Sequence, residues 1–365
     1  MDIFAATRDF ERWLGSTVPI VRRDVALKHA LMAEDSFSFF RATFYRAIER
    51  WLEICGDLAK APRLLAVCDA HVENFGTWRD REGRLIWGVN DVDEVWPAAY
   101  TLDLVRLTTS AYLAIQQEHL GLTRAEAAEA IEAGYREGLG AGGRPFVLAE
   151  DHRWLRLLAL SKLRDPVRFW KRMRLNPPCR ADQAAGARAL IAAALPARRA
   201  YQLKRRVAGL GSLGQPRIVG LASWQGGLVA REAKAVRPSA WAWYRHLARA
   251  GLFGPRLVAR AVRVEDPEMH FHGRWLVRRL APDCSRIELT ALPAARDERR
   301  LLYCMGWEVA NLHLATPRAI AAVKRDLARR DGRWLHKAAK AMAKACLEDW
   351  EDWRAGWRKA RGRIA

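Results

Sequence analysis

The sequence predicts an α+β protein that is rich in helix and carries a small antiparallel sheet. Apolar residues recur at helical spacing through most of 3–60, 101–138 and 295–361. Two short apolar runs, at 64–67 and 85–89, each end in polar residues, and two runs separated by Gly226 and Gly227 have the pattern of a β-hairpin. Because helical and strand patterns occur in separate blocks, we expect a helical lobe and a smaller sheet lobe.

The chain length and a change in composition indicate how these lobes divide the sequence. A chain of 365 residues can bury a large core and is long enough for two lobes. The composition changes near Ala200, where glycines and short apolar runs replace basic helical sequence. We therefore expect a helical lobe at 1–200, a β-rich lobe at 201–290, and C-terminal helices at 291–365 that pack on both.

The net charge favours an anionic partner. The chain has 62 Lys and Arg against 41 Asp and Glu, which gives a formal net charge of +21. Such a charge attracts nucleotides, phosphorylated metabolites, nucleic acids or anionic lipids. The basic residues are spread along the chain without a nucleic-acid-binding module, so a nucleic-acid partner is the weaker alternative. An Arg-rich and Ala-rich composition also arises from codon usage in a GC-rich genome.

Several features argue against other classes of protein. The six cysteines form no CxxC pair and have no His at zinc spacing, so neither a zinc site nor a disulfide framework is expected. No apolar run reaches the roughly 18 residues of a membrane span, and the N-terminus lacks the apolar core of a signal peptide. A cytoplasmic location without membrane association is therefore expected, while the sequence sets no oligomeric state.

Acidic and amide side chains follow both early apolar runs. The first run ends at Asp69, with His71 and Asn74 close behind, and the second ends at Asp91 and Asp93. We expect two neighbouring buried strands whose ends meet, because carboxylates are rarely buried unless they are paired or bind a metal. Oxygen ligands of this kind suit Mg²⁺. The alternative is a plain hairpin whose turns are capped by Asp and Asn.

The spacing of Asp69 and Asn74 is the Asp-x-x-x-x-Asn of the protein-kinase catalytic loop. There the Asp accepts the proton of the substrate hydroxyl and the Asn binds a metal ion. A further Asp after the next strand holds the other metal contact, and Asp91 has that position here. Asp69 is therefore the candidate base, with Asn74, Asp91 and Asp93 as candidate metal ligands.

A second candidate region begins at Gly209, where Gly209, Gly211 and Gly214 form G-x-G-x-x-G. A hairpin follows, whereas a dinucleotide-binding loop would require a helix, so the pattern fits a kinase-type loop over phosphates. In the hairpin's second strand, alternation places Lys234 on one face and Arg231 on the other. We take Lys234 as the phosphate-binding cation and Arg231 as the second choice. The alternative is an ordinary hairpin with glycine turns.

Four local expectations accompany these candidates. We expect one helix from Phe37 to Leu52, capped by Asp35 or Ser36. Within it, Arg41 either forms a surface salt bridge or reaches the acidic residues that follow. Residues 138–145 are expected to form a flexible loop, and a helix is expected from Ser239 to Ala250.

Seven sequence motifs together identify a resemblance to DUF2252, a bacterial family of unknown function. In chain order between residues 32 and 283 they read MAEDSFSFFRAT, CDAHVENFG, NDVDE, DLVRLTTS, GLGSLG, REAKAVRPSA and VRRLAPD. The family in turn resembles the protein-kinase-like and aminoglycoside-phosphotransferase-like fold, because its GDxHxxN and NDFDE motifs are similar to the catalytic and metal-binding motifs of those enzymes.

The resemblance implies a role for individual residues. Asp69 would be the base, with His71 beside it in the catalytic motif, and Asp103 would stabilise the catalytic loop. Metal ligands would come from Asn74 and Asp91. The phosphates would lie under a loop formed by Gly209, Gly211, Ser212 and Gly214, and would be bound by Lys234.

The chain departs from these families in three respects. The family's Gly before the catalytic Asp is Cys68 here, and the Gly after the helix Arg is Ala42. The glycine loop follows the catalytic motif along the chain, whereas in kinases it precedes it, so the resemblance implies a circularly permuted fold. The helix after Lys234 contains no Glu to pair with this lysine, which leaves Glu232 or Glu308 as its partner.

The function expected from the sequence is an ATP- and Mg²⁺-dependent phosphotransferase acting on a small-molecule acceptor. The alternatives are a nucleotide-binding pseudokinase or scaffold without turnover, and a metal-dependent phosphoesterase using Asp69, His71, Asp91 and Asp93. The high net charge leaves a nucleic-acid-binding protein as a further alternative.

Overall fold

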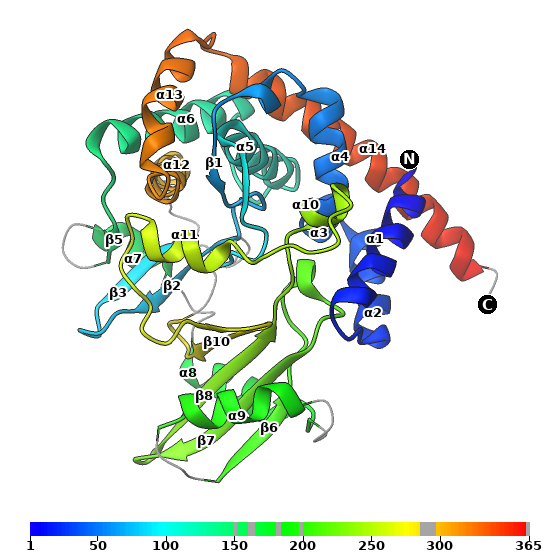
Figure 1. Ribbon diagram of the computed structural model, residues 1–365, viewed down its shortest axis with the longest axis vertical. Coiled ribbons are helices and arrows are strands. Elements are labelled where there is room, and N and C mark those ends of the chain that lie inside the picture. Colours follow the sequence, from blue (N-terminus) through cyan, green and yellow to red (C-terminus); the bar gives the residue numbers. More distant parts are fainter. Residues whose placement is uncertain (149–151, 160–164, 180–183, 197–199, 285–296, 363–365) are drawn as a thin grey trace.

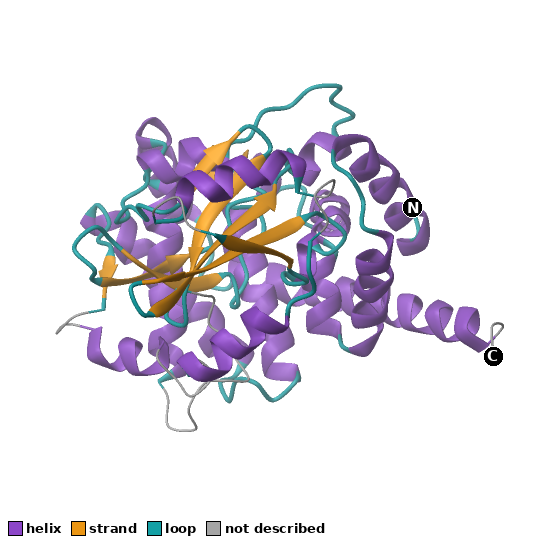
Figure 2. Cartoon of the chain, turned by 90° about the horizontal axis from the view of Figure 1, so that it is seen from below, coloured by secondary structure: helices purple, strands orange, loops and turns teal. Residues whose placement is uncertain are grey.

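The computed structural model describes residues 1–148, 152–159, 165–179, 184–196, 200–284 and 297–362. In this part of the chain many helices surround three antiparallel sheets, as Figures 1 and 2 show. The predicted α+β class with small antiparallel sheets is therefore confirmed. No helix of the described part is long and apolar enough to cross a membrane.

The N-terminal region forms four helices. They are α1 (Ile3–Thr17), α2 (Arg22–Glu34), α3 (Ser36–Ala42) and α4 (Phe44–Ile54). Asp35 caps α3 as predicted, because its carboxylate accepts a 2.7 Å hydrogen bond from the Ser38 backbone N–H. The prediction of one helix from Phe37 to Leu52 is wrong. The backbone of Thr43 leaves the helical region (φ −122°, ψ 41°), and its hydroxyl donates to the carbonyl of Phe39.

Two small sheets follow. They contain β1 (Arg63–Ala66) paired with β4 (Trp96–Ala99), and β2 (Phe75–Arg79) and β3 (Leu85–Val89) paired as a hairpin, with β5 (Phe146–Val147) beside β3. The prediction that the strands before Asp69 and Asn90 are neighbours is wrong, because β1 and β3 lie in different sheets. The sequence did not predict β2. Nearly all its residues are buried, so it lacks the alternation of apolar and polar residues by which a strand is recognised.

A group of long helices forms the largest core of the described residues. Its members are α5 (Tyr100–Gln116), α6 (Arg124–Ala141), α12 (Glu298–His313), α13 (Pro317–Arg329) and α14 (Trp334–Gly362). Nearly every residue of α5 is buried, and the helix packs against α6 and α14. The loop predicted at 138–145 is shorter than expected. Helix α6 continues to Ala141 and ends at Gly142, whose φ of 78° favours glycine.

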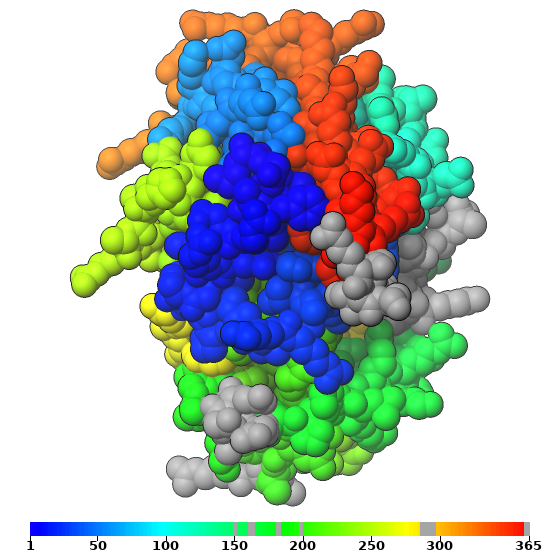
Figure 3. Space-filling model, turned by 90° about the vertical axis from the view of Figure 1, so that its right-hand side faces the viewer, coloured from blue at the N-terminus to red at the C-terminus, as the bar shows by residue number. Residues whose placement is uncertain are grey.

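The N-terminal and C-terminal helices lie side by side on one face of the molecule, as Figure 3 shows in blue and red. The ring of Phe4 on α1 stacks on Trp353 of α14 with centroids 5.1 Å apart. Deeper in the same region, Asp349 of α14 accepts hydrogen bonds from Arg46 and Arg50 of α4. The two ends of the chain are thus joined by packing and by ion pairs.

The largest sheet has five antiparallel strands in the order β6-β7-β8-β10-β9. The strands are β6 (Tyr201–Arg205), β7 (Arg217–Trp224), β8 (Gly227–Ala235), β10 (Trp275–Leu280) and β9 (His270–His272). One face packs on α9 (Ala185–Ala194), and apolar residues of the other pack on Phe169 and Met173 of α8 (Pro166–Leu175). The hairpin predicted around Gly226 is confirmed.

Short elements connect the sheet to the long helices. They are α10 (Ala240–Tyr244), α11 (Gly254–Arg260), α7 (Arg153–Ala159) and two 3₁₀ turns, η1 (Leu58–Lys60) and η4 (Leu210–Ser212). The helix predicted from Ser239 to Ala250 ends at Tyr244, because His246 adopts a left-handed conformation with φ of 51°.

Candidate active site

A cavity of about 460 Å³ lies between the five-stranded sheet and the segment that carries the early acidic residues. We call residues 69–94 the acidic segment and residues 209–214 the glycine loop. Both line the cavity, together with Arg41 of α3 and Arg278 of β10. The regions singled out in the sequence, although far apart along the chain, therefore meet around one space.

Asp103, at the start of α5, fixes the backbone that leads into the acidic segment. Its carboxylate accepts hydrogen bonds from the N–H groups of Val67 (2.7 Å) and Cys68 (2.6 Å), and His313 Nε2 lies 2.9 Å from it. Asp103 and His313 are fully buried. The stabilising position that the resemblance implied for Asp103 is thus present in the structure.

Cys68 shows why the related family has glycine at this position. Its φ is 67°, a left-handed conformation that strains a residue with a Cβ atom by about 1–2 kcal/mol. The two hydrogen bonds to Asp103 flank this residue and hold the conformation in spite of the strain. The departure from glycine therefore leaves the loop geometry intact.

Asp69 follows directly and is held by Arg106 of α5. The Arg106 Nε atom donates to the Asp69 carboxylate at 2.7 Å, and the same guanidinium donates to the carbonyl of Phe40 and stacks on its ring. Burial raises the pKa of Asp69 to about 6, against the opposing charge of Arg106. A carboxyl with this pKa is a suitable proton acceptor near neutral pH. His71 lines the cavity close to it.

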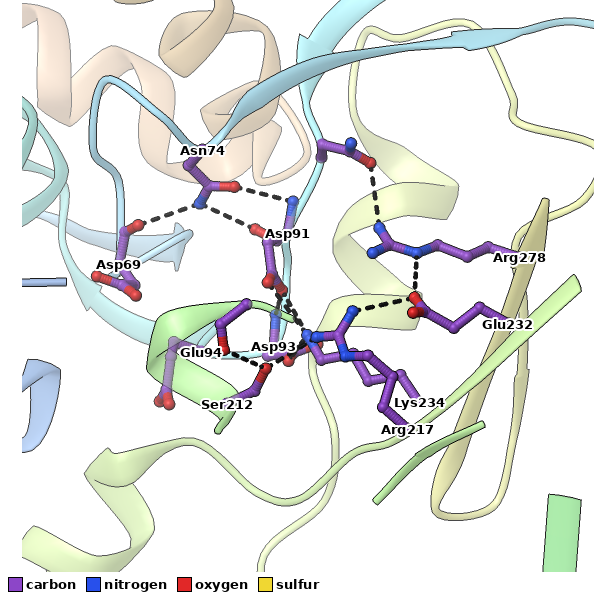
Figure 4. Close-up of polar contacts among 12 residues, drawn as sticks. Asp69, Asn74, Asp91, Asp93, Glu94, Ser212, Arg217, Glu232, Lys234 and Arg278 are labelled. Carbon is purple, nitrogen blue, oxygen red and sulfur yellow. Dashed lines mark hydrogen bonds and ion pairs between the residues drawn. The ribbon is translucent and has the colours of Figure 1, made fainter. Parts of the chain in front are cut away.

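Asn74 joins the two ends of the acidic segment, as Figure 4 shows. Its side-chain amide donates to the carbonyl groups of Asp69 and Asp91, both at 3.1 Å, and its oxygen accepts the Asp91 N–H at 2.9 Å. The ends of β1 and β3 therefore come together through this side chain, although the strands are not neighbours in a sheet.

Lys234 of β8 forms ion pairs with Asp91 and Asp93, two residues that line the cavity, although Lys234 itself is not among the lining residues. Its Nζ atom lies 3.1 Å from Asp91 Oδ2 and also pairs with the carboxylate of Asp93, while its side chain is only 2% exposed. Neither Glu232 nor Glu308, the partners considered from the sequence, contacts it among the described residues. The two aspartates of the acidic segment are its partners.

Burial and Lys234 act on the two aspartates in different ways. Burial alone would raise the pKa of Asp91, but the charges of Lys234 and Arg278 outweigh it and hold this pKa below its ordinary value. Burial and the charge of Asp91 raise the pKa of Asp93 to about 6.

Both aspartates are suitable ligands for Mg²⁺. The described residues include no group of three or more His, Cys, Asp or Glu arranged to hold a metal. Mg²⁺ is commonly held by one or two carboxylates and completes its octahedron with phosphate and water oxygens. The carboxylates of Asp91 and Asp93 meet at the Lys234 ammonium, and the amide of Asn74 adjoins Asp91, so the donor set fits this ion.

The glycine loop connects β6 to β7 and covers one end of the cavity. Gly209 has a φ of 76°, and a Cβ atom there would lie 2.7 Å from the guanidinium of Arg217. A Cβ on Gly211 would lie 3.0 Å from the carbonyl of Arg41, while Gly214 adopts a φ of 95°. Ser212 accepts a 2.8 Å hydrogen bond from Arg217. Glycine is thus required where the loop approaches the arginine.

Arg231, the second phosphate-binding candidate, lies on the other face of β8. It forms an ion pair with Glu268 at 2.8 Å and is not among the residues that line the cavity. The alternation used in the sequence analysis already separated it from Lys234. Among the candidate site residues, Arg231, Gly214 and Lys234 do not line the cavity, but Lys234 contacts two residues that do, Asp91 and Asp93. The remaining candidates all line it.

Three other arginines were missed by the sequence analysis. Arg206, Arg217 and Arg278 surround the buried carboxylate of Glu232 and line the cavity. Burial alone would raise the pKa of Glu232, but the three guanidinium charges hold it well below its ordinary value. Arg278 lies opposite Glu232 in the pairing of β10 with β8. Knowledge of this register would have identified Arg278 as a site residue, but the register cannot be read from the sequences of the individual strands.

Two further ion pairs connect the motifs. Glu94 accepts hydrogen bonds from Arg237 (2.6 Å), the Ser239 hydroxyl (2.9 Å) and the Ala240 N–H (2.7 Å), which ties the acidic segment to the chain after β8. Arg41 pairs with Glu73, so this arginine reaches the acidic segment, as one of its two predicted roles required.

The family comparison agrees with this part of the molecule. The model of the family described as an uncharacterized protein conserved in bacteria (DUF2252) matches residues 21–152. The resemblance identified from the sequence is confirmed over this portion, which includes the acidic segment and Asp103. No curated protein and no solved structure matched the chain.

Proposed function

We propose that this protein is an ATP- and Mg²⁺-dependent phosphotransferase with a circularly permuted, two-lobed protein-kinase-like arrangement. The observation that supports the proposal is the ion pairing of Lys234 with Asp91 and Asp93, which line one cavity together with Asp69 and the glycine loop. A strand-borne lysine, a pair of metal-binding carboxylates and a separate basic carboxylate are the parts that phosphoryl transfer requires.

In this proposal each part has one task. Lys234 and the glycine loop position the phosphates, while Asp91 and Asp93, with Asn74, would hold Mg²⁺, which neutralises phosphate charge when bound. Asp69 orients the acceptor hydroxyl and takes its proton. The acceptor oxygen bonds to the γ-phosphorus as the bond from that phosphorus to the bridging oxygen breaks, which leaves ADP. Positioning and electrostatics supply most of the catalysis in such chemistry.

The packing of the two chain ends supports a permuted order. In the conventional order the glycine loop and its lysine precede the catalytic carboxylate, whereas here they follow it. A permutation requires that the original ends could be joined and new ends opened at the surface. Helices α1 and α14 lie side by side here, with Phe4 stacked on Trp353.

The direct test is a comparison of Asp91→Ala with the intact protein. Binding of ATP is measured by calorimetry with and without Mg²⁺, and transfer of the γ-phosphate is measured in a metabolite extract. We expect Asp91→Ala to abolish Mg²⁺-dependent transfer while circular dichroism stays unchanged. Asp331→Ala, an exposed carboxylate remote from the cavity, is the matched control.

The outcomes separate the candidate functions. Transfer that persists in Asp91→Ala would rule out the proposed metal-binding role. ATP binding without transfer to any acceptor would indicate a nucleotide-binding scaffold. Hydrolysis of phosphate esters without a nucleotide donor would indicate a phosphoesterase that uses Asp69, His71, Asp91 and Asp93.

A further inference from the structure

The arginines around Glu232 carry more positive charge than their one carboxylate can neutralise. Arg206 Nη1, Arg217 Nη1 and Arg278 Nε lie 2.5, 3.0 and 3.0 Å from its two oxygens. These three guanidinium groups, which stay charged at any ordinary pH, and the neighbouring Lys234 are compensated by three carboxylates, those of Glu232, Asp91 and Asp93, so positive charge is in excess. Uncompensated charge at a largely buried site is unfavourable unless an anion is bound there.

Two of these arginines present their remaining donors to the cavity. Glu232 is completely buried behind them, whereas the side chains of Arg206 and Arg278 are 21% and 18% exposed. A guanidinium has five N–H groups. In the described part of the chain, the side chain of Arg206 bonds to Glu232, and that of Arg278 bonds to Glu232 and makes one further, long contact of 3.4 Å with Asn90.

The glycine loop leaves this arginine cluster accessible. Arg217 anchors the loop by donating to Ser212, and Gly209 lies against the same guanidinium without a side chain to cover it. Glu232 lies two residues before Lys234 on the same face of β8, roughly 7 Å along the strand, while Arg217 of β7 is paired in register with Lys234. The cluster is thus directly adjacent to Lys234 and extends away from it along the strand.

We propose that Arg206, Arg217 and Arg278 form a second anion-binding subsite that takes a phosphoryl group. Guanidinium groups match the oxygens of phosphate in charge and geometry. The inference deepens the proposed function, since it assigns the cavity a ligand with phosphoryl groups at two neighbouring positions. The second group belongs either to the phosphate chain of the nucleotide or to a phosphorylated acceptor.

The chain supplies matched controls, because two of the arginines have a neighbouring arginine that points away from the cavity. Arg205 pairs with Asp24, and Arg279 pairs with Glu268; neither lines the cavity. The full-length variants Arg206→Gln and Arg278→Gln are therefore compared with Arg205→Gln and Arg279→Gln. Affinity for tripolyphosphate and for ATP is measured by calorimetry at one fixed salt concentration.

We expect each cavity variant to lose roughly tenfold to a hundredfold in affinity for tripolyphosphate, the effect of a charge-assisted hydrogen bond, while the controls change less than about twofold. Glu232→Gln removes the negative charge and is expected to tighten tripolyphosphate binding. Equal losses in cavity and control variants would overturn the proposal, as would weaker binding by Glu232→Gln in a folded protein.

Further ligands identify the source of the phosphoryl group. If Arg206→Gln weakens ATP but leaves adenosine unaffected, the group belongs to the nucleotide chain. If it weakens a sugar phosphate and leaves ATP unaffected, the group belongs to the acceptor, and both results support the subsite. Binding of an anion is measured without turnover. The subsite proposal can therefore fail while the Asp91→Ala test supports the phosphotransferase, and the subsite proposal can hold while that test fails.

Discussion

The two walls of the cavity are built in different ways. The acidic wall depends on the irregular stretches that follow β1 and β3, which are held by side chains that bond to main-chain groups. Asp103 bonds to Val67 and Cys68, and Asn74 bonds to Asp69 and Asp91. On the opposite wall, β7, β8 and β10 hold their side chains through strand register, and ion pairs are formed between side chains. A loop needs polar clamps to define it, whereas a strand position follows from its neighbours.

This difference predicts different consequences of mutation. On the acidic wall, removal of a clamp changes backbone geometry, so stability and activity fall together. On the sheet wall, removal of a charged side chain leaves the backbone pairing intact, so binding falls more than stability. The following variants test this contrast in order of expected effect.

The largest effect is expected for Asp103→Ala. The variant leaves two buried N–H groups and His313 without their acceptor, which should lower the free energy of unfolding by about 3–5 kcal/mol. Urea denaturation followed by fluorescence measures the change. Glu351→Ala, at an exposed position on α14, is expected to change it by less than about 0.5 kcal/mol. A loss below about 1 kcal/mol in Asp103→Ala would contradict the clamp.

Lys234→Met tests the sheet wall. We expect ATP affinity to fall roughly tenfold to a hundredfold, since one charge-assisted contact to phosphate is lost, with little change in the circular dichroism of the sheet. Arg231→Met, three residues earlier on the opposite face of β8, is the control and should keep its ATP affinity. Equal losses in the two variants, measured by calorimetry, would show that the lysine acts through sheet stability.

The pH dependence of stability reports on Asp69. Its pKa is about 6 in the folded protein and 3.8 as a free side chain, so between these values the folded state binds more protons. The stabilisation is present below pH 3.8 and is lost as the pH rises to about 6. The carboxyl is 20% exposed, so the change amounts to about 2 kcal/mol.

Asp69→Asn removes this titration. The free energy of unfolding of the variant, relative to the wild type, should therefore increase by about 2 kcal/mol from pH 4 to pH 7. Denaturation curves at several pH values measure it. A difference between the two proteins that is constant with pH would contradict the raised pKa.

The smallest effect concerns the strained residue next to Asp69. At Cys68, with φ of 67°, glycine should be more stable than alanine by about 1 kcal/mol. At Cys304, inside α12, the order should reverse, with alanine more stable by about 1 kcal/mol. The Gly and Ala variants at each position are compared with each other by thermal unfolding. Both lack the cysteine sulfur, so its loss does not contribute to the difference in stability between them. The same order at both sites would contradict the strain.

The sequence revealed the parts of the site that depend on local pattern. Asp69 and Asn74 follow an apolar run at a recognisable spacing, and Gly209 to Gly214 precede a hairpin, so short stretches of chain contain the signal. The α+β class follows from periodicity alone. These features are set by backbone conformation within a few residues, which is the range over which sequence patterns are informative.

Contacts between distant segments could not be predicted in this way. The partners of Lys234 are aspartates more than a hundred residues earlier, and no periodicity in either segment specifies that pairing. Arg206 and Arg278 reach Glu232 only because strands β6, β7, β8 and β10 adopt one register. The pairing of β1 with β4 was also hidden, since both strands are too short for a distinct pattern.

The amide of Asn74 sets the distance between the backbones of Asp69 and Asp91. One primary amide, two bonds from its own backbone, spans the peptide units of Asp69 and Asp91, so their spacing is determined by the covalent dimensions of a single side chain. Serine is too short to span this gap, glutamine is one methylene too long, and aspartate lacks the N–H donors. The backbones of Asp69 and Asp91 are thus held at one spacing, whatever the opposite wall does.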